Sequence, residues 1–374
     1  MKRCIFHYLH PIEDKPNVGS ALRPNQMLQA FRDIGYEVDT VIGYSTQRKK
    51  QIRKIKQNIK NGVCYDFVYS ESVNDPTLLS DADHFPRHPF LDFSFLRFCR
   101  KQGIPVGLFY RDVYWKFPIF REGTSLLKRM ILKPMFAYDL LKYPKCLDLM
   151  FLPTMRMQQY ALPGFPSRAL PPGGVLRPES YEKRRAATRE SGRLHIFYVG
   201  SLSALYDNRL LFQAVQETPG AYLTVCTHQK QWESVRPLYE PYLCDRIEVV
   251  HKSGDALREY YEAADVAAYC LNHDEYLDMA MPIKVFESIS YGTPLLVTSI
   301  FSIAQLVQSE DIGWVVETSV QGIRQMLTHL MSHPEEVRQK TEHTILAAQS
   351  NTWQCRALQA AKGLTELKKK EKQT

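Results

Sequence analysis

The sequence lacks three features, each of which would assign it to a well-known class of protein. None of its apolar runs reaches the roughly 20 residues that a membrane-spanning helix needs, and the basic residues 1–3 are not followed by the apolar stretch of a signal peptide. Its eight cysteines include no Cys-x-x-Cys pair, so they indicate neither a zinc site nor a disulfide framework. The dinucleotide-binding motif Gly-x-Gly-x-x-Gly is also missing. We expect a cytoplasmic protein that is either soluble or peripheral to a membrane.

Length and composition indicate a globular protein of two domains. The chain has 374 residues, of which 44% are hydrophobic and 24% are charged, and a single core rarely grows beyond about 250–300 residues. The charge is uneven, because residues 1–180 hold 27 Lys and Arg against 16 Asp and Glu (net +11), whereas the remainder holds 21 against 24 (net −3). The basic first half predicts an anionic partner: a membrane surface, a nucleic acid or a phosphorylated substrate.

The first half begins with the pattern of a nucleotide-binding βαβ unit. Residues 4–9 predict a strand, residues 27–34 have the period of a helix, and residues 38–42 predict a second strand. The loop before the helix contains Gly19 and Ser20, whose backbone N–H groups could face a sugar or a phosphate. A plain tight turn explains these two residues equally well.

Charged and aromatic residues follow another strand, predicted at residues 105–110. They are Arg111, Asp112, Tyr114 and Trp115. Ligands of doubly wound folds bind at the carboxyl ends of strands, where aromatic rings stack on sugars and carboxylates accept hydrogen bonds from sugar hydroxyls. A buried structural salt bridge is the alternative.

Two basic segments of the first half have the pattern of helices that contact anionic lipid. Residues 48–60 predict a basic amphipathic helix, and residues 116–145 interleave cations with many aliphatic and aromatic side chains. The large aliphatic side chains of the second segment fit a bilayer interface better than a nucleic acid, and no nucleic-acid-binding module is present. A solvated charged face and a buried packing helix are the respective alternatives. The cations are Arg48, Lys49, Lys50, Arg53, Lys54, Lys56 and Lys60 in the first segment, and Lys116, Arg121, Lys128, Arg129, Lys133, Lys142 and Lys145 in the second.

The second half repeats the alternation of strands and helices. We place the first domain at residues 1–178, a polar linker at 179–192, a second domain at 193–350, and a C-terminal helix at 351–374 that packs back on the first domain. Within the second domain, residues 282–294 predict a short helix that carries Lys284 and Glu287 one turn apart, followed by a buried strand. These two side chains fit a site for a phosphate and a sugar hydroxyl, and a surface ion pair fits them equally well.

Six sequence segments, in this order, resemble the GT-B glycosyltransferases, above all glycosyltransferase family 4 of bacterial capsule and lipopolysaccharide synthesis. The resemblance implies an α/β fold of GT-B architecture, in which two doubly wound Rossmann-like domains face a central cleft. It runs over nearly the whole chain. The segments are Gly19-Ser20 with Gly35-Tyr36-Glu37-Val38, Leu170-Pro171-Pro172-Gly173-Gly174-Val175, Tyr198-Val199-Gly200-Ser201-Leu202, residues 257–266, Pro282-x-Lys284-x-x-Glu287, and Gly292-x-Pro294.

The resemblance also implies roles for individual residues. Glu287 would accept hydrogen bonds from the ribose hydroxyls of the donor, and Lys284 would face its diphosphate together with the backbone of the glycine loop. Asp112 would lie where acceptor and reacting sugar meet, and with Lys284 and Glu287 it completes the implied catalytic set. The implied donor-binding residues are Gly19, Ser20, Gly200, Ser201, Arg209, Lys284 and Glu287, and the implied acceptor-binding residues are Arg111, Asp112, Tyr114 and Trp115.

The chain departs from the family's pattern at three positions. Met279 stands where the first Glu of the family's Glu-x7-Glu motif would be, with Asp278 beside it, and Ser201 and Tyr206 stand where relatives have a diphosphate-binding Arg and Lys. The cationic role would then fall on Lys284, with Arg209 or Arg111 as further candidates. The motif Asp81-Ala82-Asp83-His84 resembles the Asp-x-Asp metal site of the other large glycosyltransferase class, but so short a match is weak, and we expect no metal site.

The function implied by the resemblance is sugar transfer from a UDP-sugar, or alternatively a GDP-sugar, to a lipid-linked saccharide or polysaccharide. We expect no required cofactor, a retaining outcome and a location on the inner face of the plasma membrane, with both basic segments on an anionic bilayer and no nucleic acid bound. Two alternatives remain: a sugar-nucleotide epimerase or hydrolase of the same fold, and a catalytically silent partner in a polysaccharide assembly complex.

Overall fold

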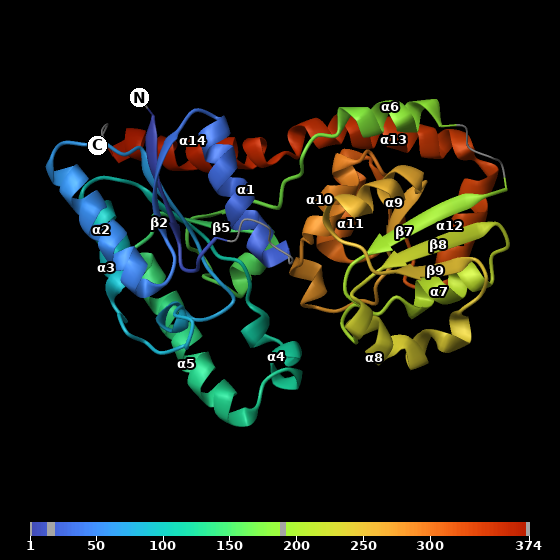
Figure 1. Ribbon diagram of the computed structural model, residues 1–374, viewed down its shortest axis with the longest axis horizontal. Helices are drawn as coiled ribbons and strands as arrows, with labels where there is room; N and C mark the ends of the chain where they lie inside the picture. The colour runs from blue at the N-terminus through green and yellow to red at the C-terminus, as the bar shows by residue number, and fades with distance from the viewer. Residues whose placement is uncertain (1, 13–18, 188–191, 372–374) are drawn as a thin grey trace. The chain divides into compact units, whose positions relative to one another are not determined.

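The chain folds into two compact units in a computed structural model (Figure 1), which describes residues 2–12, 19–187 and 192–371. Unit 1 comprises Met1–Pro171 and Trp353–Thr374, and unit 2 comprises Pro172–Thr352. The stretch expected as a linker contains helix α6 (Pro178–Ala186), which belongs to unit 2, and the C-terminal helix α14 (Trp353–Glu371) belongs to unit 1.

Unit 1 is built on a parallel six-stranded sheet of order β2-β1-β3-β4-β5-β6. Every strand is short, and the central ones are buried over most of their length, as the continuous apolar runs of the sequence predict. The strands are β1 (Arg3–Tyr8), β2 (Glu37–Ile42), β3 (Phe67–Glu71), β4 (Val106–Phe109), β5 (Leu149–Leu152) and β6 (Ser167–Ala169). The α-helices are α1 (Gly19–Asp33), α2 (Ser45–Lys60), α3 (Leu91–Lys101), α4 (Pro118–Glu122), α5 (Leu126–Lys142) and α14.

Helices cover both faces of this sheet. Helices α1 and α14 pack together over the face that carries Phe6, whereas α2 and α3 pack together over the face that carries His7 (Figure 1). The two residues are neighbours on β1 and therefore point to opposite faces.

Unit 2 is built on a second parallel six-stranded sheet, of order β12-β11-β10-β7-β8-β9. The predicted fold class, α/β with two doubly wound Rossmann-like units, is confirmed. The strands are β7 (Leu194–Val199), β8 (Ala221–Cys226), β9 (Ile247–Val250), β10 (Val266–Tyr269), β11 (Leu295–Thr298) and β12 (Gly313–Val316). The α-helices are α6, α7 (Arg209–Gln216), α8 (Gln229–Tyr239), α9 (Arg258–Ala263), α10 (Ile283–Ser290), α11 (Phe301–Glu310), α12 (Val320–Ser332) and α13 (Pro334–Ser350).

The basic helix α2 differs from its prediction as a membrane-contacting helix. Its apolar residues Ile52 and Ile55 are buried in unit 1, so they cannot enter a bilayer. Arg48 is only 1% exposed. The interfacial interpretation of residues 48–60 is therefore wrong for Ile52, Ile55 and Arg48, whereas Ile59 and the other cations of α2 are exposed or partly so.

Arg48 is instead the centre of a buried polar network. Its guanidinium donates to both oxygens of Asp92, at 2.8 Å each, and to the backbone oxygen of Leu9 at 2.7 Å. His7 lies 2.9 Å from the same carboxylate through Nε2 and 2.8 Å from Ser70 Oγ through Nδ1. Burial alone would raise the pKa of Asp92, but His7 and Arg48 outweigh it and lower that pKa to about 2.

No helix in the described part of the chain is both long enough and apolar enough to cross a membrane.

Candidate functional site

The strand order of unit 2 reverses between β7 and β10. The chain proceeds from β7 outward to β9, then returns to the other side of β7 and continues outward to β12. In doubly wound folds, ligands bind outside the carboxyl ends of the strands at such a switch point. The segments that follow β7 and β10 are residues 200–208 and 270–282, and the second leads into α10.

Glu287 lies on α10 and is held by two neighbours. Lys284 Nζ donates to its Oε2 at 2.7 Å, and the hydroxyl of Tyr261 donates to the same oxygen at 3.2 Å. Burial first, and then the charge of Glu287, raise the pKa of the Tyr261 hydroxyl well above its ordinary value, so it remains a donor. Both contacts fall on Oε2, and no described group bonds Oε1, while the Glu287 side chain is 25% exposed. One carboxylate oxygen is thus available to a ligand.

The Lys284–Glu287 pair is an ion pair, as its spacing predicts, and it is only partly covered. The Lys284 side chain is 33% exposed. Its ammonium group has three donors. Because α10 begins at Ile283, Lys284 also lies in the first turn, where free backbone N–H groups and the helix dipole favour an anion.

Gly200 and Ser201 directly follow β7 at the switch point. The Tyr198 hydroxyl donates to the Ser201 backbone oxygen at 2.6 Å, and the Gly200 N–H donates to the Cys226 backbone oxygen at 3.1 Å. A Cβ atom at Gly200 would lie 2.9 Å from the Tyr198 hydroxyl, so any larger residue would have to displace that ring. The turn is therefore fixed by its own strand and by β8.

Arg209, expected to bind the donor, has a carboxylate partner within unit 2. Its Nε and Nη2 donate to Asp207 at 2.7–3.0 Å, and Asn272 Nδ2 donates to the same carboxylate at 3.3 Å. Burial raises the pKa of Asp207, but the hydrogen bonds from Arg209 outweigh it and lower that pKa below its ordinary value. No described group bonds Arg209 Nη1, and the side chain is 47% exposed, so the guanidinium can keep this pair and still offer donors to a diphosphate.

The segment where a first Glu was expected is occupied by buried side chains. Met279 is 4% exposed and Asp278 is 8% exposed. The Asp278 carboxylate accepts from the Phe301 N–H at 3.0 Å, at the start of α11, and lies 3.3 Å from His273 Nε2. Asp278 therefore caps a helix, and Met279 offers no acidic group.

Unit 1 has its own charged cluster at the carboxyl end of β3, which borders the switch point between β1 and β3. Glu71, the last residue of β3, is fully buried. It accepts from Arg23 Nε at 3.2 Å and from the Tyr69 hydroxyl at 2.9 Å, and Arg111 Nη2 lies 3.7 Å from its other oxygen. The alternative of a buried salt bridge thus holds for Arg111.

The other predicted acceptor residues of unit 1 have different environments. The Asp112 carboxylate is half-buried and accepts from the Tyr114 N–H at 2.9 Å. Tyr114 is also half-buried, and burial raises its pKa to about 12. Trp115 is 7% exposed and stacks on Phe136, with ring centroids 5.2 Å apart. The prediction that Trp115 stacks on a sugar is wrong, because its ring is used in the core.

Gly19 and Ser20 are the first residues of α1. Most of the glycine loop before them lies outside the described residues, as does the Ser20 side chain, so their expected role stays a prediction. Their position at a helix start is compatible with backbone N–H groups that face an anion.

The Asp-x-Asp motif is not a pair of converging carboxylates. Asp81 accepts from the backbone N–H and the hydroxyl of Ser45, at 2.7 and 2.6 Å, and thereby caps α2. Asp83 forms an ion pair with Arg87. Each carboxylate thus has a structural partner of its own.

Sequence reasoning missed Tyr261, Glu71 and Arg23. Glu71 had a signal, because a carboxylate that ends a buried strand next to a switch point is expected near a ligand site. Tyr261 and Arg23 had none, since their partners lie 26 and 48 residues away along the chain.

Comparison with known proteins gives a family match within unit 2. Residues 180–345 match the family model described as glycosyl transferases group 1, a stretch that includes β7, β10 and α10. No curated protein sequence matches the chain.

Solved structures of similar fold cover nearly the whole chain at low sequence identity. Sucrose-phosphate synthase from Thermosynechococcus elongatus has a TM-score of 0.66 and 13% identity, covering 98% of this chain and 99% of its own. Anabaena HepE, in complex with UDP and glucose, has a TM-score of 0.61 and 13% sequence identity, and the match covers 98% of this chain and 100% of HepE. WaaG, a glycosyltransferase involved in lipopolysaccharide biosynthesis, has a TM-score of 0.59 and 15% sequence identity, and the match covers 96% of this chain and 99% of WaaG. These likenesses show the GT-B fold.

The matched stretch carries the switch point, the turn after β7 and the helix with Glu287, in a chain of GT-B fold. The chain is a glycosyltransferase whose second unit matches the glycosyl transferases group 1 family.

Proposed function

We propose that this protein transfers a sugar from a nucleoside diphosphate sugar, UDP-linked in preference to GDP-linked, to a lipid-linked saccharide or polysaccharide, in the manner of glycosyltransferase family 4. The observation that carries the proposal is the half-open carboxylate of Glu287, held through one oxygen by Lys284 and Tyr261 beside the switch point of unit 2. A carboxylate with one open oxygen on a rigid helix suits two adjacent ribose hydroxyls.

The binding roles follow from the contacts. Glu287 Oε1 accepts hydrogen bonds from the ribose, while Tyr261 and Lys284 hold the carboxylate in orientation through Oε2. Lys284 Nζ turns its remaining donors to the diphosphate. The first N–H groups of α10 and the Ser201 N–H add uncharged donors near the same anion.

The chemistry requires stabilisation of a leaving diphosphate. As the bond to the anomeric carbon breaks, negative charge grows on the phosphate oxygens and an oxocarbenium-like centre forms. A fixed ammonium group and fixed N–H dipoles stabilise that charge without having to reorganise. In the proposed retaining reaction, the acceptor attacks from the face that the diphosphate leaves, and the departing phosphate takes the acceptor's proton. In unit 1, Asp112 is proposed to position the acceptor hydroxyl.

Two named relatives support the choice of substrates. The structure of Anabaena HepE contains UDP and glucose, and WaaG is described as involved in lipopolysaccharide biosynthesis. Both are similar to this chain in fold alone.

Replacing Glu287 tests the proposal. Glu287→Ala should weaken UDP binding by tenfold to about a hundredfold, because hydrogen bonds to a charged group contribute about 1.5–3 kcal/mol. It should also nearly abolish transfer to a glycolipid acceptor. Titration calorimetry with UDP and acceptor-dependent release of UDP from UDP-glucose measure the two effects. Glu233→Ala, on the exposed surface of α8, is the matched control and should change neither.

Other outcomes separate the alternatives. Release of UDP without an acceptor would favour a sugar-nucleotide epimerase or hydrolase. If neither UDP nor GDP binds the wild-type protein, the chain is a silent partner and the proposal is refuted. Unchanged transfer by Glu287→Ala would refute the assignment of that residue.

We further propose that unit 1 attaches to an anionic membrane, at the inner face of the plasma membrane, through the first half of α5. Leu126, Leu127 and Met130 are 66–69% exposed, and Ile131 is 48% exposed. Segment 116–145 carries seven basic residues against two acidic ones. Phe136 and Leu140 are buried, so α5 is anchored by its second half. The alternative of a fully buried packing helix is therefore excluded for the first turns of α5.

Vesicle binding tests this attachment. The double change Leu127→Ser and Met130→Ser should lower binding to phosphatidylglycerol vesicles about a hundredfold or more, because each of the two large aliphatic side chains contributes about 1.5–3 kcal/mol when buried in lipid. Leu346→Ser, at a 61% exposed leucine of α13 in unit 2, is the matched control. Flotation of the purified protein with the vesicles measures both. Equal binding by wild type and double variant would refute the proposal, and UDP binding should be the same in all three proteins.

A further inference from the structure

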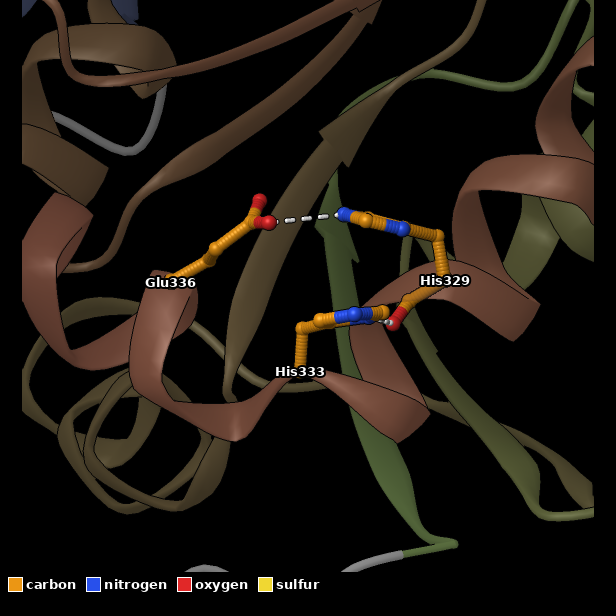
Figure 2. A group of neighbouring side chains, drawn as sticks. All are labelled: His329, His333 and Glu336. Atoms are coloured by element: carbon orange, nitrogen blue, oxygen red, sulfur yellow. Dashed lines mark hydrogen bonds and ion pairs between the residues drawn. The ribbon is translucent and has the colours of Figure 1, made fainter.

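A cluster of three metal-ligating side chains lies on unit 2, apart from the switch point. His329 is near the end of α12, His333 joins α12 to α13, and Glu336 is in the first turn of α13. One ligand atom of each lies within 4.8 Å of those of the other two (Figure 2). Two histidines four residues apart on a helix end, with a glutamate three residues later, present their ligand atoms on one side of the chain.

Hydrogen bonds hold both imidazoles, but only that of His333 leaves its Nε2 free for a metal. His329 Nε2 lies 2.8 Å from Glu336 Oε1, and His333 Nδ1 lies 2.8 Å from the backbone oxygen of His329. Because a carbonyl oxygen only accepts, the proton of neutral His333 is on Nδ1, and its Nε2 keeps the lone pair that binds a metal. A backbone carbonyl bonded to the other ring nitrogen is the arrangement that commonly holds a histidine ligand in place. The two rings stack, with centroids 4.1 Å apart and planes 22° apart, so the exposed His329 ring has to turn before both Nε2 lone pairs, which lie in the ring planes, point at one ion.

The backbone that carries the cluster is fixed to the sheet. Pro334 begins α13, where its ring restrains the backbone, and the His333 N–H donates to the Leu330 backbone oxygen. The Gly192 N–H donates to the Met331 backbone oxygen at 3.1 Å, just before β7 begins. The corner between α12 and α13 thus lies at the amino end of β7, whereas α10 follows the carboxyl end of its neighbour β10. The cluster and Glu287 therefore lie at opposite ends of the strands of the same sheet.

We propose that His329, His333 and Glu336 bind one divalent cation of the zinc class, with water completing its coordination. Zinc prefers imidazole nitrogen and carboxylate oxygen at about 2.0–2.2 Å in a tetrahedral arrangement, which sets its ligands about 3.3 Å apart. The hydrogen bond from His329 Nε2 to Glu336 Oε1, at 2.8 Å, would be replaced by a bond from each atom to the cation, and the exposed side chains, 41% for His329 and 37% for Glu336, can turn to make them. The cation cross-links α12 to α13. The site would stabilise unit 2 and take no part in sugar transfer.

Metal titration of the full-length protein, freed of metal with a chelator, tests the proposal. The expected result is one equivalent of Zn²⁺ or Co²⁺ bound and a higher melting temperature of the protein with Zn²⁺ than without. His333→Ala and Glu336→Gln should each weaken binding at least tenfold and remove most of that rise, since each loses one of three ligands. His343→Ala, at another surface histidine that bonds a carboxylate, Asp311, is the matched control and should bind as the wild type does.

Two further measurements make the result decisive. The melting temperature of each variant is compared with and without Zn²⁺, so a change in the stability of the metal-free protein does not enter. The Co²⁺ spectrum should lack thiolate charge-transfer bands, because no cysteine is in the cluster, and Cys64→Ser, which removes an exposed thiol, should bind as the wild type does. No binding, binding unchanged by His333→Ala and Glu336→Gln, or thiolate bands would overturn the proposal. UDP binding is expected to be independent of Zn²⁺, so the outcome is separate from that for the donor site.

Discussion

Asp92 in unit 1 and Glu287 in unit 2 are both carboxylates paired with a cation, but their environments differ. Asp92 is 4% exposed, and both of its oxygens accept from Arg48, one of them also facing His7. The Glu287 side chain is 25% exposed, and both of its contacts fall on Oε2. The first carboxylate has no room for a ligand, and the second has one oxygen open.

The difference distinguishes structural ion pairs from pairs that a ligand can enter. A buried charge must be compensated inside the protein, because its desolvation costs several kcal/mol. A half-exposed pair loses little when it opens, because water or a ligand replaces its partner. The charge of a residue therefore says less about its role than the number of its polar atoms that already have hydrogen-bond partners within the protein.

Removing Arg48, the cation of the buried pair with Asp92, should have the largest effect on stability. Arg48→Met leaves Asp92 buried with only His7 near it, and we expect a loss of about 3–5 kcal/mol in the free energy of unfolding. Arg53→Met, at an exposed position of the same helix, should change it by less than about 0.5 kcal/mol. Urea unfolding of both variants measures the difference. Similar values for the two would show that the buried network is not structural.

A third carboxyl group, Asp139 in α5, sharpens the comparison because it is buried without a cation. Asp139 is 3% exposed, and its Oδ2 accepts from the Thr77 N–H at 2.7 Å. Burial raises its pKa to about 7, against about 3.9 for an exposed aspartate. Between these two values the folded protein keeps a proton that the unfolded chain has released. This group therefore makes the folded state less stable as the pH rises from about 4 to about 7.

Asp139→Asn should remove this pH dependence. The variant carries a neutral side chain of the same shape, so at pH 8 it should be more stable than the wild type by up to about 4 kcal/mol. The gain should shrink to below about 0.5 kcal/mol at pH 4, where the wild-type carboxyl is protonated in the folded state and about half protonated in the unfolded chain. Thermal or urea unfolding between pH 4 and pH 8 gives the two curves. A gain that does not vary with pH would contradict the assigned pKa.

The sequence was sufficient for the fold and for the position of Glu287. Short apolar runs alternating with amphipathic stretches predict parallel strands with helical crossovers, and the structure confirms both sheets. Glu287 and Lys284 share one helical turn, so their spacing alone brings them together. Local patterns predicted local neighbours correctly.

The sequence failed where the deciding contact is distant. Arg48 stands in a run of cations that looks solvated, and only the fold brings it to Asp92, 44 residues later. Trp115 follows a strand end, as a sugar-stacking ring would, but Phe136 from α5 covers it. A run of charge or an aromatic residue at a strand end does not reveal which individual side chain turns inward.

The smallest expected effect on stability is that of Lys284→Met, and it compares the two kinds of pair most directly. The Lys284–Glu287 pair is part-exposed, and pairs of this kind contribute about 0–1 kcal/mol, so the free energy of unfolding should fall by less than about 1 kcal/mol. UDP binding should nevertheless weaken by about tenfold or more, because the proposed diphosphate contact is lost. Urea unfolding and calorimetry on the same preparation measure the two. A loss of stability as large as that expected for Arg48→Met would show that the ion pair in unit 2 is as structural as the one in unit 1. The distinction between the buried carboxylate of Asp92 and the partly exposed carboxylate of Glu287 would then not hold.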